Sequence, residues 1–162
     1  MRPKRNQVVS GPRLLRPTKG LLGGFGLAKH QSLVSFAGRH FVLDRWSYTG
    51  QKIKYFGLLN FSKGKTGEFA AIAGFGPPEE RLAAFGEKKA WLVEIGVHDS
   101  SLSSHKLKLL KWMCGRVSRQ ARENGVNVLV SKPSVDEAKL FEEMGFKPLE
   151  NTRYLVFSLG KR

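Results

Sequence analysis

The sequence predicts an α/β protein built on one central mixed sheet with helices on both faces. Three observations lead to this prediction. Residues 91–159 read as strand, long helix, apolar strand, short helix and strand, which is an α/β layer arrangement. The strand at 126–130 is predominantly apolar, as is typical of a strand covered on both faces. Upstream, residues 54–75 carry the pattern of an antiparallel hairpin, which makes the sheet mixed.

Four β-prone runs precede this unit, at 32–36, 40–43, 54–61 and 69–75. The last two flank a loop at 62–67 that consists of turn residues and has no hydrophobic anchor, so they predict a β-hairpin. Gly76-Pro77-Pro78 ends the second strand, because proline cannot donate to a ladder. Residues 79–85 predict a short helix.

A strand at 90–97 leads into the clearest helix of the chain, at 101–124. Apolar residues recur on one face of this helix at Leu110, Met113, Cys114, Val117 and Ala121. Gly125 is well placed as its left-handed C-cap. Ser134 and Glu137 then spell a capping box. The helix that it begins runs to about Met144 and stops at Gly145, before a last strand at 152–159.

The net charge of +15 is concentrated in the first part of the chain. Residues 1–67 hold 13 Lys or Arg residues and one acid, Asp44, whereas residues 68–162 hold 15 basic and 12 acidic residues. Such a field attracts polyanions, and nucleic acid is the first candidate partner. An acidic protein, a membrane surface and a merely solubilising tail are the alternatives.

Residues 1–30 predict a basic, Pro- and Gly-rich arm, extended or loosely packed, and residues 31–162 a single domain. Leu14-Leu15 and Leu21-Leu22 are short apolar pieces of the arm that can dock on the domain. The single cysteine, Cys114, excludes an internal disulfide and fits an intracellular protein. No apolar run approaches the ~20 residues that cross a bilayer. We therefore expect a cytoplasmic protein, with an organelle transit peptide at the N-terminus as the alternative.

Residues 138–146, AKLFEEMGF, resemble the last helix of the GNAT acyltransferase superfamily, and residues 127–134 resemble the strand before it. The strand at 91–97 with its long helix is similar to the cofactor-binding β-α unit of that family. The hairpin at 54–75 stands where the family has its two central antiparallel strands. The resemblance covers residues 32–159 and implies an acyltransferase-like group transfer, with acetyl-CoA or a related acyl donor.

Two positions depart from the GNAT pattern. The family binds the pyrophosphate of acetyl-CoA on a glycine-rich turn at a helix N-terminus, where backbone amides face the anion. The corresponding residues 98–108, HDSSLSSHKLK, contain no glycine, so the usual cradle is absent. Many members use a tyrosine as general acid on the last helix. Phe141 stands there and cannot donate a proton.

A narrower set of motifs resembles the divergent phage Mom-like DNA-modification branch of GNAT-like proteins. The matching pieces are His40-Phe41, Trp46-Ser47-Tyr48, Tyr55-Phe56-Gly57, residues 74–78 and residues 94–104. That branch also lacks a normal acetyl-CoA loop, and it acts on DNA. The resemblance implies an enzyme that modifies a DNA base, protects phage DNA from restriction and works in the host cytoplasm.

Five residues are candidates for catalysis: Glu94, His98, Asp99, Ser101 and Tyr48. Glu94 is the one acid inside an apolar strand, so it is a general base if buried and an ordinary surface residue if strand alternation turns it outward. His98 follows the carboxyl end of the same strand, where α/β sheets favour ligands, and is a candidate base, with Asp99 orienting it or binding a cation. The alternative is a surface turn in which Asp99 or Ser100 caps the next helix. Ser101 either activates substrate or belongs to the helix entry. In GNAT-like folds the region of Tyr48 shapes the acceptor side.

Two further groups complete the candidate sites. The cofactor-binding candidates, which otherwise serve as helix-entry residues, are Ser100, Ser103, Ser104, His105 and Lys106. The nucleic-acid-binding candidates, which otherwise are solvated charges beside core aromatics, are Arg39, His40, Arg45, Lys52, Lys108, Lys111 and Arg119. The residues near the N-terminal strand form a basic and aromatic group of the kind that stacks a base while holding phosphate, namely Arg39, His40, Arg45, Tyr48 and Lys52. No metal site is expected, and DNA is favoured over RNA.

Three functions follow from these observations. The first is a GNAT-like transferase that modifies a DNA base, which must be flipped or single-stranded. The second is a catalytically inactive GNAT-fold module that binds DNA or RNA, such as a ribosome-associated protein. The third is a conventional acetyl-CoA-dependent N-acetyltransferase. An enzyme is favoured over a binding module.

Overall fold

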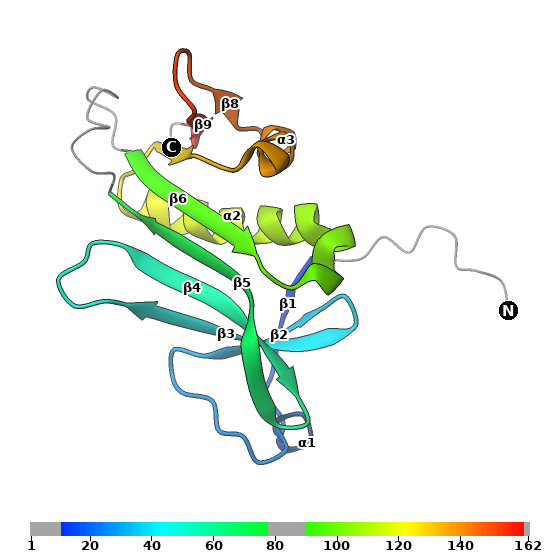
Figure 1. Ribbon diagram of the computed structural model, residues 1–162. Coiled ribbons are helices and arrows are strands. Elements are labelled where there is room, and N and C mark those ends of the chain that lie inside the picture. The colour runs from blue at the N-terminus through cyan, green and yellow to red at the C-terminus, as the bar shows by residue number, and fades with distance from the viewer. Residues whose placement is uncertain (1–10, 78–89, 161–162) are drawn as a thin grey trace, which may run out of the picture.

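The computed structural model describes residues 11–77 and 90–160. Within these residues, nine strands form one sheet in the order β1-β2-β3-β4-β5-β6-β7-β9-β8 (Figure 1). The strands are β1 (Arg13–Leu15), β2 (Ser32–Phe36), β3 (Arg39–Ser47), β4 (Lys54–Ser62), β5 (Lys65–Gly76), β6 (Ala90–Val97), β7 (Val128–Ser131), β8 (Lys147–Pro148) and β9 (Leu155–Ser158). The helices are α1 (Lys19–Leu22), the 3-10 helix η2 (Ser100–His105), α2 (Lys106–Glu123) and α3 (Val135–Glu143).

The sheet is mixed, which confirms the predicted fold class. Each neighbouring pair from β1 to β6 is antiparallel, and so are the pairs β7–β9 and β9–β8. Only β6 and β7 are parallel, because η2 and α2 connect them as a crossover. The predicted helix at 79–85 lies outside the described residues.

Two tight turns set the register of the antiparallel strands. Ala37 and Gly38 join β2 to β3 with φ angles of 52° and 73°, and Lys63 and Gly64 join β4 to β5 with the same values. Two consecutive residues at positive φ match the right-handed twist of a hairpin. The loop expected at 62–67 is therefore shorter than predicted, since its flanking residues continue the two strands.

Helix α2 lies against one face of the sheet (Figure 1), and its apolar stripe packs into the core there. The stripe holds the predicted residues together with Leu109, and all of these side chains are buried. They pack against Phe56, Leu58 and Val93 from the strands in one continuous core. The helix ends as predicted at Gly125, whose φ is 73°. Its start differs, because the segment from Ser100 forms a 3-10 turn before α2 begins.

A second, smaller core lies on the opposite face of the sheet. Leu33, Val42 and Phe61 are buried there beneath side chains from residues 15–27. Residues 13–15 form β1, which pairs with β2 at the edge of the sheet. The Asp44 carboxylate accepts a hydrogen bond from the Gln31 side chain at 3.2 Å and lies 3.1 Å from His30 Nε2. Residues 11–30 of the expected loose arm therefore contribute one strand, the short α1 and apolar contacts to the fold. Residues 1–10 lie outside the described part.

The predicted capping box of α3 is not formed. The helix begins after Ser134 as expected, but the serine side chain makes no cap hydrogen bond. The Glu137 carboxylate instead pairs with Lys106 at the start of α2, at 2.8 Å. A tertiary ion pair thus replaces the local hydrogen bonds of the capping box. None of the helices in residues 11–77 and 90–160 has the length and apolar character needed to cross a membrane.

Candidate functional site

Strands β6 and β7 pair over a short distance and then separate. The parallel ladder joins Ala90, Trp91 and Leu92 to β7, whereas residues 93–97 pair with β5 alone. Strand β7 ends at Ser131, and the chain turns away into α3. The carboxyl half of β6 therefore borders an opening in the sheet, at the end of parallel strands where α/β proteins hold their ligands.

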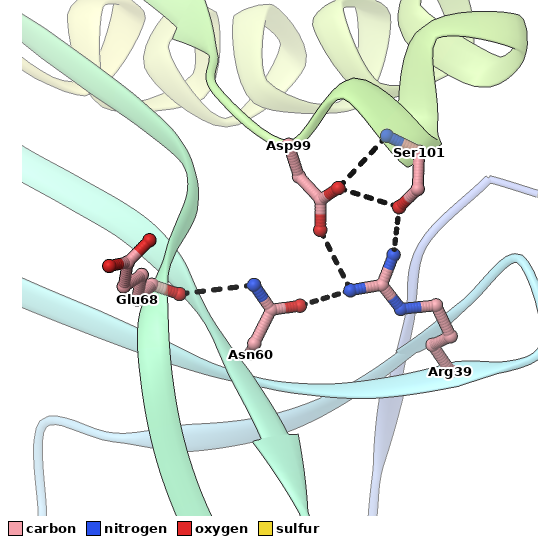
Figure 2. Close-up of polar contacts among 5 residues, drawn as sticks. All are labelled: Arg39, Asn60, Glu68, Asp99 and Ser101. Carbon is pink, nitrogen blue, oxygen red and sulfur yellow. Dashed lines mark hydrogen bonds and ion pairs between the residues drawn. The ribbon is translucent and has the colours of Figure 1, made fainter.

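At the end of β6 a hydrogen-bonded network holds Asp99 in place (Figure 2). The Asp99 carboxylate accepts from the backbone N–H of Ser101 at 2.9 Å and from its hydroxyl at 2.6 Å. Arg39, which arrives from β3, donates to Asp99 at 2.8 Å, to the Ser101 hydroxyl at 2.7 Å and to the Asn60 side-chain oxygen. Asn60 in turn donates to the Glu68 carbonyl at 3.2 Å.

This network fixes the charge of Asp99. The hydrogen bonds from the Ser101 side chain and from Arg39 hold the pKa of Asp99 well below its usual range, so the carboxylate stays ionised at neutral pH. Asp99 thus occupies the N-cap of η2 and satisfies donors that an external anion would otherwise bind.

The residues here do not fit the pyrophosphate of acetyl-CoA. An ionised carboxylate stands at the helix entry, and no glycine lets a phosphate approach the backbone. Lys106 pairs with Glu137, and the His105 ring packs edge-on against Phe36 at 5.9 Å between centroids. Ser100, Ser103 and Ser104 are exposed along η2. Their role as cofactor ligands stays a prediction.

Two chemical candidates share the sheet face opposite α2. Glu94 and Gly96 alternate with the buried Val93 and Ile95 along β6, so they lie on the outer face. The His98 ring lies against Gly96, 3.1 Å from the position that a Cβ would take there. Glu94 is exposed, which selects the surface interpretation of this residue over the buried one. Its role as a base stays a prediction, as does that of His98.

An aromatic cluster lies on the same outer face beside these residues. It comprises Trp46, Tyr48, Tyr55 and Phe69. Trp46 stacks on Tyr55 with an interplanar angle of 9°, contacts Phe69 at 4.9 Å, and Tyr48 meets Tyr55 edge-on. The register aligns Trp46, Tyr55, Gly74 and Glu94 in one row across β3 to β6. No helix among the described residues covers this row, and Tyr48 is 56% exposed.

Glycines make room for these rings. A Cβ at Gly74 would lie 2.9 Å from the Tyr55 ring, and one at Gly57 would lie 2.8 Å from Phe69. The rings of Tyr55, Phe69 and His98 therefore lie over glycine backbone on three neighbouring strands. Sequence reasoning did not find this arrangement, although glycine inside a strand is a signal of close approach.

The basic group expected around β3 is divided between its two ends. Arg39 lies at the first residue of the nine-residue β3, and Arg45 lies six residues on. At about 3.3 Å per residue the two are about 20 Å apart along the strand. His40 lines a pocket with Asn60 and Lys63 beside Arg39, whereas Lys52 and Tyr48 lie at the opposite end. One combined cluster was therefore a wrong interpretation, because the strand is longer than expected.

The basic residues of α2 divide in a similar way. Arg119 lines a pocket of about 370 Å³ together with Arg45 from β3 and with Arg116. Lys111 is exposed and Lys108 is half-buried, both nearer the start of the helix. Arg116 was missed from sequence, because it lies between the apolar stripe and the basic one. Its only sequence signal was its spacing from Arg119.

Two residues, Phe141 and Cys114, are buried and are therefore not available for catalysis. Phe141, at the position of the family's tyrosine, is 1% exposed and packs edge-on against Phe146. Cys114 lies in the main core, where burial raises the pKa of its thiol to about 11. It is therefore no nucleophile at neutral pH. In the described part of the chain, no three His, Cys, Asp or Glu side chains gather to hold a metal ion.

Solved structures show which known fold this is. A phenylalanine variant of the AtaT toxin, bound to the C-terminus of the antitoxin AtaR and to acetyl-CoA, superposes with a TM-score of 0.52. It is 18% identical over 66% of this chain and 68% of its own. The KacTA–DNA complex gives a TM-score of 0.51 at 16% identity, over 68% of this chain and 70% of that one.

A GNAT-family protein from Desulfovibrio desulfuricans gives a TM-score of 0.50 at 14% identity, covering 67% of this chain and 70% of that one. The fold is that of the GNAT acetyltransferases. No protein-family model matches the sequence, and no curated protein matches it significantly. The GNAT resemblance of the sequence is thereby confirmed at the level of the fold, whereas the Mom-like branch stays a prediction.

Proposed function

We propose that this GNAT-fold protein is a group transferase whose acceptor is nucleic acid, with an unpaired base as the acceptor group. The observation that carries this proposal is the outer face of the sheet. The half-buried rings of Trp46 and Tyr55 lie in one row with Glu94, and the exposed Tyr48 lies beside them, next to the stretch where β6 and β7 separate. Aromatic rings on an open sheet stack bases of single strands, and the excess of positive charge attracts the backbone.

The outer face supplies groups for acid–base chemistry. Transfer of an acyl group to an exocyclic amine forms a new C–N bond, breaks the bond between the acyl carbon and the donor, whose leaving group departs with the electron pair, and releases one proton from the nitrogen. Glu94 and His98 are the proposed acceptors of that proton, and the position of both side chains along the outer face of the sheet supports this role. Tyr48, at the exposed end of the aromatic cluster, is the candidate for contacting the base. A base within a duplex must first be flipped out.

The test is mass spectrometry of nucleosides from cells that express the protein. We expect a modified nucleoside with the wild-type chain and its loss with Glu94→Gln or His98→Gln. Lys139→Gln, on an exposed position of α3, is the matched control and leaves the modification intact. A spectrum without any modified nucleoside, from cells that contain folded protein, would contradict the transferase.

The network around Asp99 favours a second candidate, a GNAT-fold protein that binds nucleic acid without catalysis. Asp99 and Arg39 satisfy each other where the family binds its cofactor, and Phe141 replaces the tyrosine acid. This candidate predicts salt-dependent binding to an oligonucleotide together with an unmodified nucleoside spectrum.

Calorimetry with acetyl-CoA separates both candidates from a conventional N-acetyltransferase. We expect no heat of binding, because no cradle for pyrophosphate is formed at η2. Binding of acetyl-CoA, combined with negligible affinity for oligonucleotides at low salt, would support the conventional enzyme and contradict a nucleic-acid acceptor.

A further inference from the structure

Three arginines meet where α2 passes the sheet near the end of β3. Arg45 from β3 and Arg116 and Arg119 from α2 line one pocket of about 370 Å³, which also includes Trp112 and Phe56. The ion pairs among residues 11–77 and 90–160 are those of Asp44, Asp99 and Glu137, and none of them involves these arginines. Among the described residues that line the pocket, Glu123 is the single acid, against three arginines.

Arg116 is the most constrained of the three. Its guanidinium lies over the Trp112 ring at 5.1 Å and faces Phe56 at 6.0 Å. Burial lowers the pKa of Arg116, and the charges of Arg45 and Arg119 lower it further. The group nevertheless stays protonated, since arginine keeps its charge in proteins. Three like charges thus repel one another in a concave, partly aromatic site, and a bound anion would relieve that repulsion.

The glycine in the middle of α2 points to the same site. Gly115 lines the pocket, and a Cβ built on it would meet no other atom within 4 Å. Glycine inside a helix is less favourable than alanine, and no neighbouring side chain here occupies the space that it leaves. Packing within the described protein therefore does not require the glycine, and the open space beside it leaves room for a ligand.

A second pocket adjoins the first around an unpaired stretch of strand. It has a volume of about 290 Å³, shares Arg45 and Gln120 with the first pocket, and is also lined by Trp46 and Tyr55. Strand β2 pairs with β3 only as far as Leu43, so within the described part of the chain the last residues of β3 have no strand partner on that side. The arginines and the stacked aromatic pair therefore flank one accessible edge of the sheet.

We propose that Arg45, Arg116 and Arg119 bind a phosphate group of a nucleic-acid strand, and that Trp46 and Tyr55 contact the adjoining base. The guanidinium fork matches phosphate oxygens, and base–aromatic stacking tolerates any sequence. The proposal rests on the nucleic-acid acceptor proposed above and names the site that holds it. A polymer is favoured over a mononucleotide because the net charge of +15 engages several phosphates at once.

The first test compares two arginines by fluorescence anisotropy with a labelled single-stranded oligonucleotide. Arg119→Gln removes a charge inside the pocket, and Arg153→Gln removes one from an exposed loop outside it. We expect an increase in Kd of about tenfold for the first and about twofold for the second. Equal effects would overturn the proposal, because they would show that only total charge matters.

The second test fills the pocket. Gly115→Leu puts a side chain into the empty space and improves helix propensity, so the variant folds at least as stably as wild type. We expect a loss of oligonucleotide affinity of about tenfold or more together with an unchanged or higher Tm. Gly115→Ala adds one methyl group and keeps most of the affinity. If Gly115→Leu binds the oligonucleotide with wild-type affinity, the proposal that this pocket is the binding site would be overturned, whereas the proposed function would not be affected.

A third arm separates the sources of phosphate. Inorganic phosphate and a nucleoside monophosphate are added to wild type and to Gly115→Leu, and the Tm of each is recorded. If the small ligands raise the Tm of wild type but not that of Gly115→Leu, and no oligonucleotide binds, the proposal of a nucleic-acid ligand would be overturned. That result would support a small phosphate ester as the ligand of the pocket. We expect weak stabilisation of wild type by both small ligands and tight, salt-dependent binding of the oligonucleotide.

Discussion

Asp99 acts at the scale of single residues as the link between the sheet and the start of η2. Its carboxylate caps the 3-10 helix and pairs with Arg39, which lies 60 positions earlier in the chain. One charged group thereby closes the position at which a GNAT enzyme receives its cofactor. The sequence predicts Asp99 as a catalytic candidate. In the structure, its capping role is the main reason to expect that acetyl-CoA does not bind at this helix entry.

Replacing the carboxylate tests this structural role. Asp99→Asn keeps a helix-capping side chain and removes the ion pair, so we expect the free energy of unfolding at pH 7 to fall by about 1 kcal/mol. The pKa of Asp99 is held below its ordinary value of 3.8, so its stabilisation is present above that pH and is lost as the pH falls further. Urea unfolding at pH 7 and at acid pH measures the difference between variant and wild type.

Asp136→Asn is the control, because Asp136 is an exposed acid in the first turn of α3. We expect the destabilisation by Asp99→Asn to shrink at acid pH, and that by Asp136→Asn to stay small throughout. An Asp99→Asn effect of equal size at both pH values would contradict the ionised pair with Arg39.

At the scale of elements, the N-terminal segment shows how a small helix completes a face of the sheet. In α1, Leu22 packs against the second core, whereas its neighbour Leu21 is 38% exposed. Without this segment, Leu33, Val42 and Phe61 would face water on the side opposite α2. Part of residues 1–30, which composition predicts to be a loose arm, therefore packs against the sheet and contributes to the stability of the fold.

The two leucines of α1 give a matched pair of variants. Leu22→Ala should lower the free energy of unfolding by about 1–2 kcal/mol, because it removes apolar contacts with the second core. Leu21→Ala should change it by less than about 0.5 kcal/mol. Urea unfolding monitored by tryptophan fluorescence measures both. Equal effects of the two substitutions would show that α1 is not docked through Leu22.

At the scale of the whole molecule, the uneven distribution of charge affects both the stability of the folded state and the choice of partner. The net charge of +15 produces self-repulsion in the folded state, and Asp44, the single acid of residues 1–67, is already engaged by His30 and Gln31. The positive field of that part is therefore left largely uncompensated, which favours a polyanionic partner. In the proposed binding mode, this general attraction brings a nucleic-acid strand to the protein surface, and the arginine pocket then holds one of its phosphates.

Screening of this repulsion is measurable without any partner. We expect the Tm to rise as sodium chloride is increased from low to physiological concentration, because salt weakens repulsion between exposed charges. A polyanion such as heparin should raise the Tm further at the same ionic strength. Differential scanning calorimetry checks both, and a Tm that falls with added salt would contradict dominant self-repulsion.

Local patterns in the sequence account for most of the elements. The alternation in β2 to β6, the helical spacing on α2 and the C-cap at Gly125 each depend on neighbours within a few residues. The same kind of evidence misplaces the loop at 62–67 and the capping box at Ser134. There, strand pairing extends the hairpin and a distant lysine takes the Glu137 carboxylate, both of which are decided outside the local segment.

Composition and periodicity by themselves determined the mixed sheet, the amphipathic α2 and the concentration of positive charge, whereas the GNAT-like order of elements was implied by the resemblance of particular motifs to that family. The tertiary structure alone decided which side chains meet. Arg39 reaches Asp99, and Arg45 joins Arg116 and Arg119, because strand register and the packing of α2 bring together residues that are far apart in the chain. A side chain's nearest neighbours in sequence fix its element and its face, whereas its chemical partners depend on how the elements pack.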